Sequence, residues 1–280
     1  MRETIEFRID EGLAQRFLEP NLGTRLSDTL RRVVLPTTDE RVQQIGEIQR
    51  TYRKNGGFFF IYWDVRRKYS EKELQAAQLL HVIVRTVFEP TGEECGTAYD
   101  ETTACKRCGV GASQTSALIL DTRRIPKGKD IARTIGGEIV VSRRFANAFS
   151  EHGLQGAKFQ PVLHRERRGL EPSEWSQLVV TSSPVKFSPR TVTGNTPFDL
   201  DDQNEHRCPR GHTAGLTWLS EFFVLRSSYD GSDLLCTEKM FGLRRGYLRP
   251  EPQLVISQKL RRVLVDMKAK GFELEVAHLV

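Results

Sequence analysis

Two short cysteine-containing segments, far apart in the chain, constrain the fold more than any other sequence feature. The first reads Cys-Lys-Arg-Cys-Gly over residues 105–109, and the second reads Cys-Pro-Arg-Gly-His over residues 208–212. Zinc takes four nitrogen or sulfur ligands in a tetrahedron, and one tight turn with two such residues supplies half of them. The sequence therefore predicts that Cys105, Cys108, Cys208 and His212 can join two distant parts of the chain through one metal ion.

Cys95 is a further candidate ligand, because it lies ten residues before Cys105. The choice between Cys95 and His212 for the fourth position stays open at this point, and buried free thiols are the alternative to a metal site. The chain has five cysteines, an odd number, which disfavours a disulfide framework. The cofactor we predict is structural zinc, since four protein ligands leave the ion no open position for a substrate.

The last third of the chain repeats the plan of its middle. Cys105 precedes Asp130 by 25 residues, and Cys208 precedes Asp233 by the same distance. Ile-Val-Val-Ser at 139–142 then corresponds to Leu-Val-Ile-Ser at 254–257, and each serine begins a basic amphipathic segment followed by a glycine and a strand pattern. Chance similarity is the alternative. Two copies predict a pseudo-symmetric pair, because a solenoid needs at least three repeats.

We predict an α+β fold in which two related knuckle-strand-helix-strand modules follow an N-terminal region of helices and strands. The predicted domains are an N-terminal region at 1–90, a first module at 91–164, a linker and extended loop at 165–205, and a second, degenerate module at 206–280. Hydrophobic periodicity and capping residues predict helices at 24–35, 39–54, 71–80, 131–135 and after Ser142 and Ser257. Asp199, Asp201, Asp202 and Glu205 are expected to form a solvated acidic loop.

Composition and termini narrow the class of protein. The chain has 280 residues, with 42 Lys and Arg against 36 Asp and Glu, and a formal net charge of +6. This charge permits binding to nucleic acid or to other acidic partners. The first residues lack the apolar run of a signal peptide, and no segment reaches the roughly 18 uninterrupted apolar residues of a membrane span. We therefore expect a cytoplasmic protein with no membrane partner.

Sequence motifs of common enzyme classes are missing from the chain. It contains no Walker-type loop, no dinucleotide-binding fingerprint, no nucleophile elbow and no metalloprotease helix motif. A redox use of Cys105 and Cys108 is disfavoured, because no strand pattern directly precedes them. We assign no catalytic residue, and the pattern favours a binding protein over an enzyme.

The stretch from Cys105 to Val162 resembles the double-CxxCG paralogous family of myxobacteria. The resemblance rests on Cys-x-x-Cys-Gly, on Pro-x-x-Lys-Asp at 126–130, on Ile-Val-Val-Ser-Arg-Arg-Phe at 139–145 and on Gly-Leu-Gln-Gly-Ala-Lys-Phe-Gln-Pro-Val at 153–162. Residues 208–278 repeat it weakly. The chain departs from the family pattern because the second copy has lost one cysteine and the first 90 residues do not match.

Members of that family are regarded as immunity proteins that protect a cell from toxins delivered by its kin. The resemblance implies a zinc-knuckle scaffold that acts by binding a protein partner, such as a toxin, and it transfers no catalytic residue. The function we predict is thus a non-enzymatic, zinc-stabilised bacterial binding protein of toxin-immunity type. The alternative is a nucleic-acid-associated protein that uses the basic helices at 143–144 and 259–262.

Overall fold

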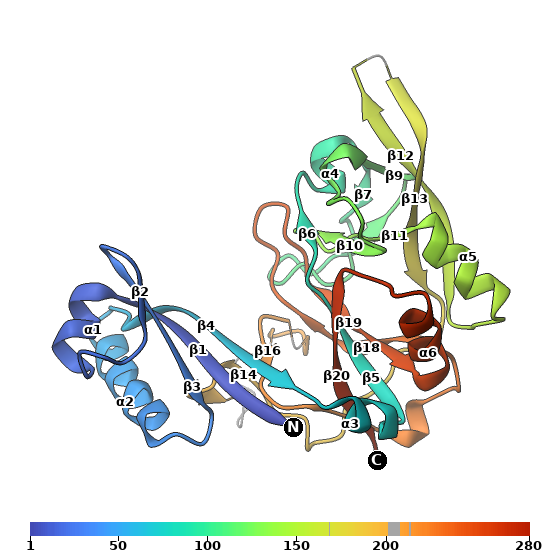
Figure 1. Cartoon of the computed structure of the whole chain (residues 1–280). Helices are drawn as coiled ribbons and strands as arrows, with labels where there is room; N and C mark the ends of the chain where they lie inside the picture. The colour runs from blue at the N-terminus through green and yellow to red at the C-terminus, as the bar shows by residue number, and fades with distance from the viewer. Residues whose placement is uncertain (168, 201–207, 213) are drawn as a thin grey trace. The chain divides into compact units, whose positions relative to one another are not determined.

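The computed structural model describes residues 1–167, 169–200, 208–212 and 214–280 (Figure 1). The chain divides into two compact units, Met1–Glu73 and Leu74–Val280. Both contain helices and strands, and strands predominate, in agreement with the predicted mixture of α and β structure. No helix in the described ranges has the length and apolar character that crossing a membrane requires. The predicted boundary after residue 205 and the acidic residues at 201, 202 and 205 lie outside the described residues.

The first unit is an antiparallel sheet with helices on one side. Its strands are β1 (Arg2–Asp10), β2 (Thr24–Ser27), β3 (Leu30–Pro36) and β4 (Phe60–Lys68), in the order β2-β3-β1-β4. Its helices are α1 (Glu11–Phe17) and α2 (Glu40–Lys54), and the Asp39 carboxylate caps α2 by accepting the N–H of Arg41. Ile5, Phe7 and Ile9 alternate along β1 and are wholly buried.

The helix predicted at 24–35 is wrong, because this stretch forms β2 and β3. Apolar residues at 26, 30, 33 and 34 fit a helical period, but Val33 and Leu35 also alternate in a strand, and β-branched valines favour strands. Pairing of β3 with β1 buries both residues on the core face. Tertiary pairing therefore decides an ambiguous local pattern.

The second unit contains two half-barrels. The first half-barrel is a six-stranded sheet in the order β6-β10-β11-β13-β12-β9. Its strands are β6 (Val87–Phe88), β9 (Leu118–Leu120), β10 (Ile131–Thr134), β11 (Ile139–Ser142), β12 (Ala157–Glu166) and β13 (Gly169–Val180). Helix α5 (Arg143–Glu151) follows β11, and the Ser142 hydroxyl caps it as predicted by accepting the N–H of Phe145 at 3.2 Å.

The second half-barrel is a five-stranded sheet in the order β17-β20-β5-β19-β18. Its strands are β5 (Leu79–Val84), β17 (Phe222–Val224), β18 (Leu234–Phe241), β19 (Glu251–Ser257) and β20 (Phe272–Leu279). Helix α6 (Gln258–Asp266) follows β19, and the predicted cap Ser257 accepts the N–H of Leu260 at 3.2 Å. In both half-barrels the outermost short strand is parallel to its neighbour, β9 to β12 and β17 to β20.

In each half-barrel, one strand occupies a central place in the sheet that does not follow its place in the sequence. Strand β5 comes before every strand of the first half-barrel, yet it pairs between β20 and β19 of the second. Strand β13 lies in the same place of the first sheet, between β12 and β11. Residues 169–180, within the stretch predicted as linker and extended loop, thus form a central strand. The finer domain division stays a prediction.

A shared apolar core joins the two half-barrels. It contains Phe145 and Phe149 of α5, Leu260 and Leu264 of α6, and Ile131 of β10. The helix predicted at 131–135 is wrong, because Ile131 pairs with Val141 in an antiparallel ladder. The run is too short for a helix to compete with that pairing.

The remaining elements of the second unit are short and are separated by loops. They are α3 (Glu71–Ala76), which begins at the end of the first unit, α4 (Gly92–Cys95), the 3₁₀ turns η1 (Thr122–Arg124) and η2 (Arg226–Ser228), and strands β7 (Tyr99–Asp100), β8 (Ser113–Gln114), β14 (Thr193–Thr196), β15 (Asp199–Leu200) and β16 (Thr217–Trp218). The segment between β7 and β8 carries the first cysteine pair, and the segment before β16 carries the second pair of candidate ligands.

Candidate metal centre

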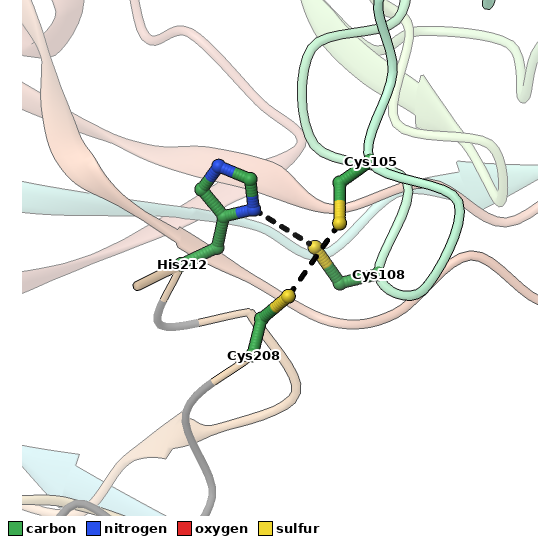
Figure 2. Close-up of side chains that lie close together, drawn as sticks. All are labelled: Cys105, Cys108, Cys208 and His212. Atoms are coloured by element: carbon green, nitrogen blue, oxygen red, sulfur yellow. Dashed lines mark hydrogen bonds between the residues drawn. The ribbon is translucent and has the colours of Figure 1, made fainter. Parts of the chain in front are cut away.

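Four of the five predicted ligands meet in one buried cluster. The ligand atoms of Cys105, Cys108, Cys208 and His212 all lie within 4.8 Å of one another (Figure 2). Cys105 Sγ is 3.5 Å from Cys208 Sγ, and Cys108 Sγ is 3.3 Å from His212 Nδ1. The three cysteines are buried, and His212 is half-buried. Two segments separated by about a hundred residues in the sequence therefore converge on one point.

The first pair of ligands sits on a tight turn. The Cys105 N–H donates to the Val110 carbonyl at 2.8 Å, and the Gly109 N–H donates to the Cys105 carbonyl at 2.7 Å. Gly109 has a φ of +81°, and a Cβ at this position would lie 2.5 Å from Cβ of Arg244. Only glycine satisfies both conditions, so the Cys-x-x-Cys-Gly pattern is set by the backbone of the turn.

The second pair sits on a turn of similar construction. The Cys208 N–H donates to the His212 carbonyl at 2.8 Å, and the Gly211 N–H donates to the Cys208 carbonyl at 2.7 Å. Gly211 takes the positive φ of this turn, +83°. The spacing from cysteine to histidine is one residue longer than in the first turn. The longer imidazole still brings its Nδ1 to the cluster (Figure 2).

The loop between β18 and β19 contacts both cysteine segments beside the cluster. The Arg244 N–H donates to the Cys108 carbonyl at 3.2 Å, and the Gly215 N–H donates to the Gly242 carbonyl at 2.8 Å. Leu243 packs with Val110 against the buried cysteines. Both cysteine segments are thereby attached to a loop of the second half-barrel.

Two arginines anchor this loop to the segment before the first cysteine pair. Arg249 forms ion pairs with Glu93 and with Glu101, and its guanidinium carbon lies 3.7 Å from the centroid of the Tyr99 ring. Arg244 pairs with Glu101 at 2.9 Å. The Tyr99 hydroxyl donates to Glu138 at 2.6 Å, so the polar network continues into the first half-barrel. Sequence reasoning missed these residues, since isolated charges in loops carry no local signal of their partners.

The two cysteines of the first turn have opposite electrostatic surroundings. The backbone N–H groups of Cys108 and Arg107 point toward Cys105 Sγ and lower the pKa of that thiol. Burial raises the pKa of Cys108, because a thiolate there loses hydration. A divalent cation would reverse the second effect, since thiolates are its ligands and its charge replaces water. The backbone of the turn thus favours a thiolate at Cys105, whereas a thiolate at Cys108 depends on the ion.

The donor set fits zinc. A tetrahedron with Zn–S bonds of about 2.3 Å has sulfur–sulfur edges of about 3.8 Å, close to the separations in this cluster. Three cysteines and one histidine are a standard ligand set of structural zinc sites, and soft thiolates favour zinc over magnesium or calcium. With all four positions supplied by the protein, a bound ion would staple the fold and would not activate a water molecule.

Cys95, the alternative fourth ligand, lies outside the cluster. It is the last residue of α4 and is buried, and burial raises the pKa of its thiol. His212 takes the position that the sequence left open between these two residues. Cys236, also outside the cluster, sits on β18 with a pKa raised by burial.

Comparisons with known proteins add no relative: no model of a protein family matches the chain, and no curated protein matches it significantly.

Proposed function

We propose that this chain is a non-enzymatic binding protein whose cysteine segments are joined by a structural zinc ion. The buried cluster of Cys105, Cys108, Cys208 and His212 carries the proposal. Because the four ligands complete a tetrahedron, the ion serves cohesion and leaves no coordination site for a substrate. The zinc holds two loops that are otherwise short of regular structure against the second half-barrel.

We further infer that the two half-barrels are copies of one repeat. Matched hydrogen bonds support this inference. The Ser142 hydroxyl donates to Asp130 at 3.0 Å, and the Ser257 hydroxyl donates to Asp233 at 2.6 Å. In each copy the serine also caps the following helix, so one aspartate, directly before β10 or β18, is bonded to the helix cap of its own copy.

Each of these aspartates also binds the other copy. Asp130 of the first half-barrel accepts the N–H of Lys270 at 2.9 Å, and its own N–H donates to the Lys270 carbonyl at 2.8 Å. Asp233 of the second accepts the N–H of Gln155 at 3.0 Å and donates to the Gln155 carbonyl at 2.9 Å. Such reciprocity is expected of two copies that pack about a pseudo-twofold axis.

The partner class we propose is a protein, and the biological role is toxin immunity in the bacterial cytoplasm. The similarity of residues 105–162 to the double-CxxCG family supports this role. An immunity protein of this kind acts by covering or sequestering its toxin, which requires a rigid scaffold and an interaction surface but no catalytic group.

The nucleic-acid alternative loses support at the basic helices it depends on. Arg144 forms a 2.6 Å ion pair with Asp130, and Arg261 is buried. Lys259 donates to the Gly153 carbonyl at 3.0 Å. Lys259 thus contacts the first half-barrel, and Arg144 also donates to the Met267 carbonyl of the second at 2.8 Å. Two of the exposed cations on these helices therefore already bind within the protein, while Arg143 and Arg262 are exposed as well.

Metal analysis of the purified full chain tests the proposal. Wild-type protein should contain stoichiometric zinc, and Cys105→Ser and Cys208→Ser should each lose it together with about 10 °C or more of thermal stability. Cys95→Ser is the matched control, since it removes a buried thiol outside the cluster and should keep its zinc. Wild-type protein without metal, or zinc lost equally in the control, would overturn the proposed centre.

A further inference from the structure

The sheet of the first unit has one face open to solvent. Odd-numbered residues of β1 are buried on the side of the core, so its even-numbered residues share the opposite face with their partners on β3 and β4. Register places Arg8 beside Arg32 and Tyr62 on this face. We call it the arginine face, and its centre consists of Glu6, Arg8, Arg32, Tyr62, Asp64 and Arg66.

This face concentrates positive charge. Arg2 and Lys68 pair at the end of the same strands and add to the three central arginines. The carboxylates on this face of β1 and β4 are Glu6, Asp64 and, at the end of β1, Asp10. Five cations against three carboxylates leave two positive charges, a third of the net +6 of the whole chain. Such an excess on one small surface attracts an acidic partner.

A buried carboxylate holds the central arginines in place. Glu6 is 3% exposed and lies 2.7 Å from Arg32 Nη2 and 3.3 Å from Arg8 Nε. Burial alone would raise the pKa of Glu6, but the two guanidinium groups outweigh it and keep that pKa below its usual value. Arg66 is held in the same way by Asp64, at 2.8 Å. Positioned side chains lose less conformational entropy when they bind.

The arginines are nevertheless available to a partner. The side chains of Arg8 and Arg32 are each 43% exposed, and that of Arg66 is 46% exposed. Arg presents several N–H donors in a planar fork that fits carboxylates, so one guanidinium can serve an internal and an external carboxylate together.

The pattern fits an acidic protein better than a nucleic acid. Single-stranded nucleic acid binds where aromatic rings stack on bases, but the Arg8 guanidinium already lies 4.5 Å above the centroid of the Tyr62 ring. Glu6 and Asp64 also interrupt the positive surface where phosphates would follow it. Arginine and tyrosine are enriched in protein–protein interfaces and among their strongest-binding residues.

We propose that the arginine face is the docking surface for an acidic patch of a protein partner. This inference rests on the proposed function as a binding protein, and it assigns recognition to the first unit while the zinc-containing unit supplies the scaffold. The partner's carboxylates would pair with Arg8, Arg32 and Arg66.

A charge-reversal experiment on the full-length, zinc-loaded chain tests this surface. The probe is a fluorescein-labelled peptide in which glutamate alternates with serine, and fluorescence anisotropy at low ionic strength measures its affinity. Wild-type protein should bind this peptide and not its glutamine analogue. Arg66→Glu/Lys68→Glu should weaken binding by about tenfold or more, because both cations lie on the arginine face. Arg143→Glu/Arg262→Glu is the control, with an equal charge change on α5 and α6, and should bind as wild type.

Other outcomes contradict the inference. It fails if wild type does not bind the peptide, if both double variants lose affinity equally, or if a thymidine oligonucleotide of equal charge binds more tightly through the same face. Thermal unfolding checks each variant, and Arg66→Gln/Lys68→Gln replaces the charge reversal if that one does not fold, with a severalfold loss of affinity expected. Zinc content of the same samples separates the two proposals, because metal-loaded protein that ignores the peptide refutes only the arginine face.

Discussion

The two half-barrels have the same order of strands but contribute different ligands to the metal cluster. Each has a parallel outer strand, a serine-capped helix and an aspartate that reaches into the other. The first contributes two cysteines from a Cys-x-x-Cys turn, whereas the second contributes a cysteine and a histidine with one more residue between them. The strands and their reciprocal contacts are thus more nearly equivalent between the two half-barrels than the metal ligands are.

The largest effect expected of that packing concerns a pair of matched glycines. Gly156 and Gly271 have φ values of +101° and +118°, and each follows the helix of its own half-barrel. An added Cβ would lie 2.1 Å from the Leu234 carbonyl oxygen at the first site and 2.1 Å from that of Ile131 at the second. Gly156→Ala and Gly271→Ala should each lower the free energy of unfolding by about 3 kcal/mol, from backbone strain and steric overlap. Urea unfolding measures both.

Gly153→Ala is the matched control for the glycine pair. Gly153 also has a positive φ, +57°, but nothing lies within 4 Å of its Cβ position. Strain alone should cost about 1 kcal/mol there. If Gly156→Ala is no worse than this control, the close approach of the two copies is not required; if only one of the pair is sensitive, the two half-barrels are not equivalent at this contact.

The aspartates allow a finer comparison, because their ion pairs differ. Asp130 lies 2.6 Å from Arg144, whereas Asp233 is 3.9 Å from Lys259. Burial raises the pKa of Asp130, but hydrogen bonds from Arg144, Lys270 and Ser142 outweigh it and leave that pKa below its usual value. A carboxyl whose folded pKa is lowered stabilises the protein above the unfolded pKa, and this contribution is lost as the pH falls through the folded value.

Asp130→Asn should therefore destabilise the protein by about 1 to 2 kcal/mol near pH 6 and by much less near pH 3. Denaturant unfolding of wild type and variant at the two pH values gives the difference directly. A penalty that stays constant with pH would show that hydrogen-bond geometry, and not the charge of Asp130, holds the copies together. Asp233→Asn shows whether the second copy depends equally on its carboxylate.

Sequence patterns indicated those parts of the fold that depend on neighbouring residues. Ser142 and Ser257 cap helices because their hydroxyls bond to N–H groups three residues later, and this spacing is visible in the chain. The equal distances from Cys105 to Asp130 and from Cys208 to Asp233 indicated the repeat and brought His212 in as a ligand. All four residues of the cluster were among the five candidates, but the choice between Cys95 and His212 was left open until the structure placed His212 in the cluster.

The same sequence patterns could not predict which strands pair over long distances in the chain. Strand β5 pairs with β19, so Leu80 faces Ile256, and no local signal specifies a partner so distant in the chain. The apolar positions are too few to distinguish a helical period from a strand pattern in residues 24–35 and 131–135. Pairing with a neighbouring strand determines that both segments form strands. The ion pairs of Arg249 depend on loops brought together by the fold and have no sequence signature.

The smallest effect is expected of a substitution that gives the two metal-binding turns the same pair of ligands. His212→Cys converts the cluster to four thiolates, a donor set that zinc also accepts, so the variant should keep its metal and lose at most about 1 kcal/mol. His212→Ala, which removes the donor, should bind zinc far more weakly. Cobalt substitution separates the variants, because the sulfur-to-metal charge-transfer band should grow with a fourth thiolate. Metal loss in His212→Cys comparable to that in His212→Ala would mean that the longer turn after Cys208 needs the reach of an imidazole, and that the second copy could not have kept a cysteine at this position.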